Sequence, residues 1–418
     1  MGLGFVSLEM LVLYFLRLQF TLTNIFLPWG VLLIFNAILF FRNKERIVCT
    51  KEAARPEAEH KFIKIFLIFA ITFEIVYAFF RTLIKPLEAY DAIAIYGIKS
   101  KIFYLASSIP HDFFSSLALH FPHADYPLNL PLSETLLYVF MGNFNDQMMK
   151  IIFPLYFIAI LIIVYFGIRR FASSTYSLLF TFLLASVPQF NAYATNGYLD
   201  LPLAYYCFVS ASFLFLWFKN TEDVHFLSIS ASFVALAGWT KNEGLMYCGA
   251  NILLILIFFI FNARAISPKK MLIYLISYAG IVFIMSMPWI LIKMGAHLVN
   301  DEMSLSNLTA SYLSKQYHKI GPIIYEFQKQ IFGPKKWNIL WIVAIFALVF
   351  RHKSILKKNI RYISIAIFLA ISGYVLSYLV SCAEIHYAVR TTWSRFLIHF
   401  LPIIIYWLAN ILKEDIDL

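Results

Sequence analysis

Charged residues are scarce in this sequence: only 14% of its 418 residues are Asp, Glu, Lys or Arg, whereas 61% are hydrophobic. Soluble domains contain about 25% charged and about 45–50% apolar residues. A water-soluble fold of this composition would lack the polar surface to cover its core, and the mean hydropathy of +0.75 agrees. The composition excludes a cytosolic enzyme, a disordered protein and a secreted disulfide scaffold, and it predicts a polytopic membrane protein.

Cysteine and N-terminal positive charge are also scarce. The four cysteines, Cys49, Cys207, Cys248 and Cys382, contain no C-x-x-C pair, so neither a zinc site nor a disulfide framework is expected. No Lys or Arg precedes the first apolar run, which argues against a cleaved signal peptide. In a chain of this hydropathy, the net charge of +11 indicates basic loops at anionic lipid headgroups rather than nucleic-acid binding.

Long apolar runs are abundant, and a membrane-spanning helix needs about 20 such residues. Twelve segments qualify, of which the first, fifth, seventh and tenth are short: 3–20, 22–41, 62–83, 150–168, 175–190, 200–218, 225–239, 244–261, 271–292, 337–350, 361–380 and 396–412. The alternating pattern of a β-barrel does not occur. The expected fold class is therefore all-α, with about 12 transmembrane helices.

Basic residues orient these helices. The Lys- and Arg-rich connections 42–61, 169–170, 262–270 and 351–361 all fall on one side if the twelve segments alternate, and the positive-inside rule makes that side cytoplasmic. Both termini then lie inside, in a multi-pass protein of the plasma (inner) membrane. The connections 84–149 and 293–336 face outward and are too long to be simple loops.

The first outer connection begins with two acids in an amphipathic stretch, Pro86–Lys99. Glu88 and Asp91 are three residues apart and would share one face of a helix that starts at Pro86. Paired carboxylates near a low-dielectric boundary have divergent pKa values, which would make one of them a general base. Alternatively, both simply complement the helix dipole.

The same connection continues through Asp125-Tyr126-Pro127 into an apolar stretch, 132–141, which predicts a helix lying in the membrane interface. A set of histidines and aspartates precedes it: His111, Asp112, His120, His123 and Asp125. Their spacing matches no metal-ligand pattern, so we expect no metal site.

Three short outer turns add further polar residues. They carry Asp200, then Lys241 with Glu243, and finally Arg390 with Arg395. Each alone is compatible with a helix cap or a snorkelling anchor. Together they place acids and cations at one membrane face, as an anionic membrane-borne substrate requires.

These segments resemble the GT-C superfamily of polyprenyl-phosphate-sugar glycosyltransferases, and most of all glycosyltransferase family 39, which includes protein O-mannosyltransferases and aminoarabinose transferases. The resemblance covers residues 62–412 in order and spacing. It rests on Glu88-Ala-Tyr-Asp91 with Ile98-Lys99-Ser-Lys101, Asp125-Tyr126-Pro127, Gly197-Tyr198-Leu-Asp200-Leu-Pro202, Thr240-Lys241-Asn-Glu243-Gly244, and Arg395 before Pro402.

The resemblance implies inverting transfer of a sugar from a polyprenyl-phosphate-linked donor to a hydroxyl acceptor at the extracytoplasmic face. Asp91 would be the general base, with Glu88 or Asp125 orienting the acceptor or tuning Asp91. Lys241, Arg390 and Arg395 would bind the phosphate of the donor. Asp200 and Glu243 would hold these cations or contact the sugar hydroxyls. Tyr126, Tyr90 and Trp393 would stack on the sugar ring.

The resemblance implies no cofactor beyond the lipid-phosphate sugar co-substrate. The D-x-D motif of a metal-dependent branch occurs only as Asp415-Ile-Asp417 in the predicted cytoplasmic tail, 413–418, so no metal is expected. The acceptor, whether glycan, lipid or protein, stays open. Nucleic acid is not expected as a partner.

The chain departs from the family pattern in three ways. Two extra helices and a basic loop, residues 1–61, precede the transmembrane domain, 62–412. Two residues separate the acidic pair, and no large soluble domain follows the last helix.

Two alternative functions remain open. An O-antigen polymerase or ligase would need essential arginines in a late outer loop. A transporter or flippase would use mid-membrane charges such as Glu9, Arg17 or Glu74, although we expect Glu74 to pair with a polar neighbour.

Overall fold

The computed structural model describes residues 2–42, 60–115, 123–298, 307–357 and 360–413, which fold into helices without a β-strand. The first half contains α1 (Gly2–Phe15), α2 (Leu22–Arg42), α3 (Lys61–Ile84), the π-helix η2 (Asp91–Gly97), α4 (Ile98–Ala106), α5 (Asn129–Met141), α6 (Asp146–Met149), α7 (Ile152–Arg169), α8 (Ser174–Ala185) and α9 (Pro188–Tyr193). The second half contains α10 (Asp200–Lys219), α11 (Val224–Thr240), α12 (Asn242–Phe261), α13 (Pro268–Gly295), α14 (Ala310–Lys315), the 3₁₀ helix η4 (Tyr317–Lys319), α15 (Ile320–Ile331), α16 (Pro334–Trp337), α17 (Leu340–Phe350), α18 (His352–Ile355), α19 (Arg361–Val380) and α20 (Ile385–Leu412).

The all-α class is confirmed, and a helix occurs at each of the twelve predicted apolar segments. Among the described residues, eight helices are long and apolar enough to cross a membrane, and four shorter apolar helices occupy the first, fifth, seventh and tenth positions. The first predicted segment, 3–20, was too long. Helix α1 ends at Phe15, and Arg17 has a left-handed backbone (φ 57°) beyond it, so Arg17 is not a mid-helix charge.

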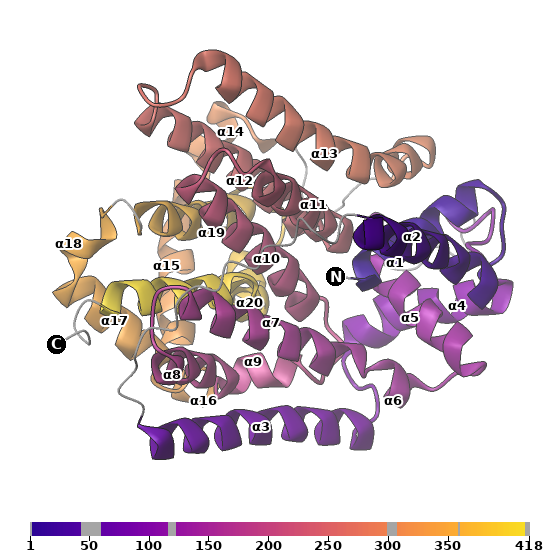
Figure 1. Cartoon of the computed structure of the whole chain (residues 1–418), viewed down its shortest axis with the longest axis horizontal. Helices are drawn as coiled ribbons and strands as arrows, with labels where there is room; N and C mark the ends of the chain where they lie inside the picture. Colours follow the sequence, from indigo (N-terminus) through magenta and orange to yellow (C-terminus); the bar gives the residue numbers. More distant parts are fainter. Residues whose placement is uncertain (1, 43–59, 116–122, 299–306, 358–359, 414–418) are drawn as a thin grey trace.

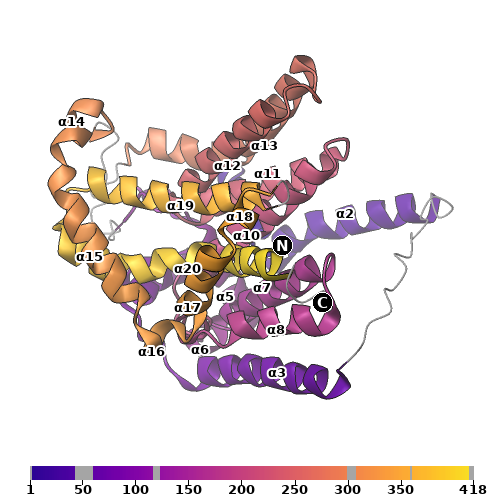
Figure 2. The same cartoon turned by 90° about the vertical axis from the view of Figure 1, so that its left-hand side faces the viewer.

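The helices form one bundle with α10 and α20 at its centre (Figures 1 and 2). Helix α3 lies along one edge, α13 lies along the opposite edge, and α2 projects away from the bundle (Figure 2). Most residues of α10 and α20 are buried, whereas α2 and α3 expose large apolar side chains such as Leu33 and Phe62. Apolar faces of this size are unfavourable in water and favourable in lipid.

Hydrogen bonds between polar side chains join four helices in the interior. Asn251 on α12 donates to Ser210 of α10 (2.9 Å) and to the Tyr278 hydroxyl of α13 (3.0 Å). Ser210 in turn donates to the carbonyl of Ser230 on α11 (2.8 Å). Such interhelical hydrogen bonds stabilise packing where lipid supplies no hydrophobic driving force between helices.

A second polar network connects α1 to the bundle. Ser7 donates to Asn129 of α5 (2.8 Å), Asn129 donates to Thr240 of α11 (2.7 Å), and the Trp239 indole donates to Ser7 (2.8 Å). Through these contacts, α1 fixes the end of α11, which immediately precedes the predicted Lys241–Glu243 turn.

Gly244 permits the close approach of α11 and α12 beside that turn. A Cβ at this position would overlap the backbone carbonyl of Ala237.

We expect Gly244→Ala to destabilise the protein by about 1–3 kcal/mol or more, because backbone atoms must move to accommodate the methyl group. Gly249 on the same helix provides the matched control, since a Cβ added there would meet no atom within 4 Å. Gly249→Ala should be neutral or stabilising by about 1 kcal/mol. The thermal unfolding midpoint in detergent measures both, and equal midpoints for the two variants would contradict the prediction.

Candidate active site

Asp200 is the centre of a buried cluster of charged side chains. It lies at the first residue of α10, where a carboxylate complements the helix dipole, and its side chain is fully buried. Its carboxylate contacts Lys241 Nζ (3.3 Å), Arg395 Nε (3.2 Å) and His399 Nε2 (2.7 Å). A buried carboxylate is tolerated when it is paired and hydrogen-bonded in this way.

Three segments distant in the sequence supply these partners. Lys241 occupies the extended break between α11 and α12, where φ is −155° and ψ is 152°. It also pairs with Glu243 at the start of α12 (2.8 Å). Arg395 and His399 are one turn apart on α20, so both side chains reach the same face of that helix.

Arg395 connects this cluster to Asp91. Its Nη2 atom lies 2.9 Å from Asp91 Oδ2 and 3.2 Å from Asp200 Oδ2, and its guanidinium stacks over the Tyr198 ring at 4.6 Å. Nη1 has no hydrogen-bond partner among the described residues. Asp91, which is partly accessible, is the first residue of η2, and single-turn π-helices occur frequently at functional sites.

Gly197 allows Asp91 to approach Asp200. It has φ 85°, and a Cβ there would lie 2.8 Å from the Cβ of Ala92 and 2.9 Å from Cδ1 of Leu87. The turn before α10 and the segment around η2 can pack together only because this position has no side chain.

The predicted helical pairing of Glu88 with Asp91 was wrong. Residues 86–89 are not helical, and Lys85, which precedes Pro86, is extended (ψ 138°), as the proline ring requires. Lys150 donates to the carbonyls of Lys85 (2.5 Å) and Pro86 (3.2 Å), which holds the segment in place. The Glu88 side chain is 62% exposed and lies 3.8 Å from Lys85, and among the described residues it makes no ion pair with Arg395 or Lys241.

Asp125 and Tyr126 adjoin the Lys241–Glu243 turn. Asp125 is buried and accepts a hydrogen bond from Asn242, between Lys241 and Glu243 (2.8 Å). The Tyr126 ring stacks on His123, with centroids 4.4 Å apart. Lys99 donates to the His123 carbonyl (2.8 Å), and burial lowers the pKa of Lys99 to about 8, with the Asp125 charge acting in the opposite direction.

Arg390 is not part of this cluster. It lies five residues before Arg395, about 140° away around α20, and its side chain is exposed. It lines a separate cavity of about 420 Å³ with Lys329, Lys335 and Lys336. No group of three or more potential metal ligands occurs in the described part of the chain; His120, Asp415 and Asp417 lie outside it.

Two buried ionisable groups, one of them in the cluster, were missed from the sequence. His399 bonds Asp200 through Nε2 and the Tyr374 hydroxyl through Nδ1 (2.5 Å); its spacing of four residues from Arg395 was the available signal. Glu134 on α5 is fully buried and accepts a hydrogen bond from Ser100. Burial raises the pKa of Glu134 from its ordinary value of 4.5 to about 8.

The raised pKa of Glu134 predicts a pH dependence of stability. Below about pH 4.5 the carboxyl is protonated in both the folded and the unfolded chain. As the pH rises from 4.5 to about 8, only the unfolded chain loses this proton, so folding stability falls by up to about 1.4 kcal/mol per pH unit. Glu134→Gln should remove this fall, measured as the thermal midpoint at several pH values across that window. Asp112→Asn, which removes an exposed carboxylate from the same connection, should retain it. A Glu134→Gln profile identical to that of the wild type would contradict the assignment.

Comparison with known proteins identifies the fold. No protein-family profile matches the sequence, and a search of curated proteins finds no relative. The structure is similar to that of ArnT from Cupriavidus metallidurans in the apo state, with a TM-score of 0.58 and 12% sequence identity over 83% of this chain and 59% of that one.

The structure is also similar to two structures of the oligosaccharyltransferase of Archaeoglobus fulgidus. The complex with Zn and sulfate gives a TM-score of 0.57 at 11% identity, covering 85% of this chain and 49% of that one. The AglB complex with an inhibitory peptide and a dolichol-phosphate gives 0.52 at 10% identity, covering 85% and 51%. The chain thus spans about half to three-fifths of the length of these proteins. It shares the fold of ArnT and of this oligosaccharyltransferase, which is the fold that the sequence resemblance implied.

Proposed function

We propose that this protein is an inverting membrane glycosyltransferase. It transfers a sugar from a polyprenyl-phosphate-linked donor to a hydroxyl acceptor at the extracytoplasmic face of the plasma (inner) membrane, with both termini in the cytoplasm. The fold supports this reaction class, and the observation that carries the proposal is Arg395, whose guanidinium spans Asp91 and the buried Asp200.

In this proposal, Arg395 and Lys241 bind the donor phosphate. Asp200 holds both cations in place, and Glu243 holds Lys241 from the other side. The Nη1 atom of Arg395 supplies a donor in the planar geometry that suits phosphate oxygens. A phosphate that draws Nη2 away from Asp91 releases that carboxylate for catalysis, while the Nε contact with Asp200 keeps the guanidinium in position.

The reaction then follows from these contacts. The acceptor hydroxyl gives its proton to Asp91, and its oxygen forms a bond to the anomeric carbon. The bond between that carbon and the phosphate oxygen breaks on the opposite face, and polyprenyl phosphate leaves with the additional negative charge. Arg395 and Lys241 stabilise this charge electrostatically, the kind of contribution that is usually the largest in such sites. Asp125 and Tyr126, beside the Lys241 turn, are placed to contact the sugar or the acceptor.

The test is donor consumption by the purified protein in detergent or nanodiscs. Polyprenyl-phosphate sugar labelled in the sugar should lose its label, with polyprenyl phosphate as the second product. Transport of a solute across vesicles without consumption of the donor would favour a transporter instead. That alternative receives no support from Glu74, because Asn191 donates to its carboxylate (2.9 Å) and satisfies it within the bundle.

A further inference from the structure

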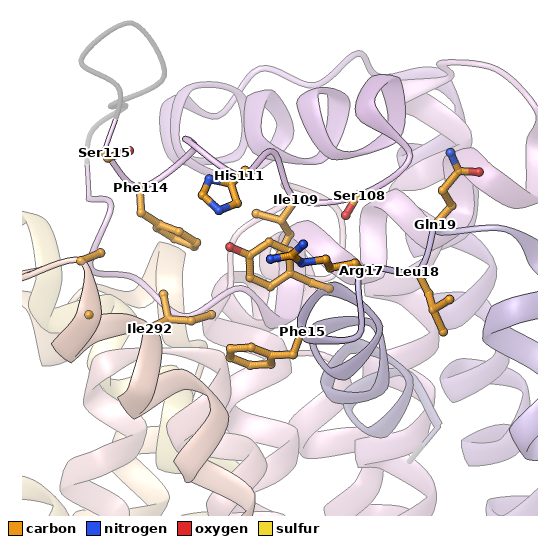
Figure 3. A pocket seen from close by; sticks show the side chains of 13 residues that line it. Phe15, Arg17, Leu18, Gln19, Ser108, Ile109, His111, Phe114, Ser115 and Ile292 are labelled. Atoms are coloured by element: carbon orange, nitrogen blue, oxygen red, sulfur yellow. The ribbon is translucent and has the colours of Figure 1, made fainter.

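A cavity separate from the Asp200 cluster lies between α1, the connection after α4 and the end of α13. Its volume is about 720 Å³, and segments 14–19, 108–115 and 292–296 line it (Figure 3). Helices α12 and α13 are consecutive, so the C-terminal end of α13 returns to the end of the bundle that carries Lys241. The cavity and the candidate active site therefore open at the same end.

The polar part of this cavity contains one permanent cation, the Arg17 guanidinium. Arg17 and His111 reach the same space from its two walls (Figure 3), and no carboxylate is among the described residues that line it. Among the described residues, neither side chain has a hydrogen-bond or ion-pair partner. Gln19, Ser108 and Ser115 add neutral hydrogen-bonding groups. Arg17 is exposed and has no carboxylate partner among the described residues, so its guanidinium is available to an anionic ligand.

Arg17 has a backbone conformation that favours glycine. After α1, the Leu18 amide bonds the Leu13 carbonyl (2.9 Å) and the Arg17 amide bonds that of Tyr14 (3.0 Å), so Arg17 occupies the left-handed position of a helix C-cap. Glycine is the usual residue at that position because it has no Cβ. The amide of Phe20 bonds the Ser107 carbonyl (2.6 Å), which joins the two walls of the cavity. The strain of a bulky residue in this turn is accounted for if the guanidinium has a ligand to bind.

An apolar groove of about 300 Å³ continues from the cavity along α13. Phe15 lines both spaces, and Ile284, Met287, Pro288 and Leu291 form the rest of the groove. Leu291 in the groove directly precedes Ile292 in the cavity, so the polar and apolar spaces adjoin on one helix. Ile284 and Leu291 are 71% and 50% exposed, so the groove is open towards the surrounding lipid.

We propose that the cavity and groove together form a binding site for a membrane lipid with an anionic headgroup. The headgroup binds Arg17 and His111, and the hydrocarbon chain lies along α13 against Phe15 and Leu291. A soluble anion would use only the cavity and a neutral lipid only the groove, whereas an anionic lipid fits both. The site does not depend on the proposed transferase activity.

The site also contacts the machinery around Lys241 through aromatic packing. Phe114 in the cavity wall packs on Trp289 of α13 (6.1 Å between ring centroids), and Trp289 packs on Trp239 (5.7 Å). Trp239 is two residues before Lys241. A lipid in the cavity would contact Phe114, which is linked through Trp289 to Trp239 next to the Lys241 turn.

The test is lipid retention by the full-length purified protein, measured by native mass spectrometry with phosphatidylglycerol or phosphatidylcholine at equal mole fractions. The wild type should retain phosphatidylglycerol in preference. Arg17→Gly removes the cation and suits the left-handed backbone, so it should keep the thermal midpoint and weaken phosphatidylglycerol binding roughly tenfold or more. The matched control is Arg81→Gln, which removes an arginine near the end of the apolar helix α3 and should bind as the wild type does.

Two further arms separate a lipid site from a soluble-anion site. Leu291→Trp fills the groove and should weaken retention of phosphatidylglycerol about tenfold. Glycerol 3-phosphate, which has the anionic group without the chains, should bind at least about a hundredfold more weakly than phosphatidylglycerol. Unchanged retention in Arg17→Gly would overturn the proposal, as would unchanged retention in Leu291→Trp or equal binding of glycerol 3-phosphate.

Discussion

Replacing Asp91 by Asn should reduce sugar transfer by about 10²–10⁴-fold, the usual contribution of a general base. The amide preserves the size of the side chain and still accepts a hydrogen bond from Arg395, so the site should stay assembled. What it cannot do is take the proton of the acceptor hydroxyl. The loss should therefore appear in kcat, with donor binding and the thermal midpoint close to those of the wild type.

Glu88→Gln is the control, because the sequence alone did not decide which carboxylate is the base. The structure places Glu88 on the surface beside Lys85 and brings only Asp91 to Arg395. Glu88→Gln should therefore change transfer by less than roughly threefold, as expected for an exposed ion pair. If Glu88→Gln lost activity and Asp91→Asn kept it, the assignment of the base would be reversed.

The helices were predictable because each leaves a local signature. A run of apolar residues indicates that the segment is buried or contacts lipid. All twelve segments could therefore be located, including the four that are too short for a standard span. The exact end of α1 could not be located from the sequence. Leu16 and Leu18 are as apolar as the helix before them, and only the left-handed turn at Arg17 shows that the helix has stopped.

Most members of the candidate site could be listed from the sequence, but their arrangement in space could not be predicted. Asp200, Lys241, Glu243 and Arg395 were chosen as charges at the ends of apolar segments, and Asp91 as one of two acids in the first outer connection. The structure brings these five together. Arg390 carried the same signal, yet five residues on a helix separate it from Arg395 by more than a quarter turn. The helical pairing of Glu88 with Asp91 was wrong for another reason, because Pro86 ends the regular backbone where a helix was expected.

The two buried groups that escaped prediction carry weaker signals in the sequence. His399 lies within a long apolar run, where a histidine is compatible with simple packing, and only the position of Asp200 on a distant helix gives it a role. Glu134 lies in a stretch that resembled an interfacial helix. The structure confirms a helix there and packs it between α1 and α4, so the carboxyl is buried rather than facing headgroups.

Replacing Arg395 by Gln should have the second large effect, on donor binding and stability together. The change leaves Asp91 without its ion pair and removes one of the cations that neutralise the fully buried Asp200. Breaking a buried pair by removing one partner costs about 3–5 kcal/mol, of which the remaining contacts of Asp200 with Lys241 and His399 should recover part. Donor affinity should fall by about 10–100-fold, the value of a charge-assisted hydrogen bond to phosphate.

Arg390→Gln distinguishes this role from a general effect of positive charge. It removes the same charge from the same helix, but from a separate cavity lined by three lysines. Competition of unlabelled polyprenyl phosphate against the labelled donor should give a similar affinity for Arg390→Gln and the wild type, and a much weaker one for Arg395→Gln. Arg395→Lys adds a geometric criterion. Lysine keeps the charge but cannot bond Asp200 and Asp91 at once through separate nitrogens, so it should recover stability more fully than donor affinity. Equal losses in Arg390→Gln and Arg395→Gln would show that the phosphate is attracted by overall charge rather than held by a guanidinium that Asp200 positions.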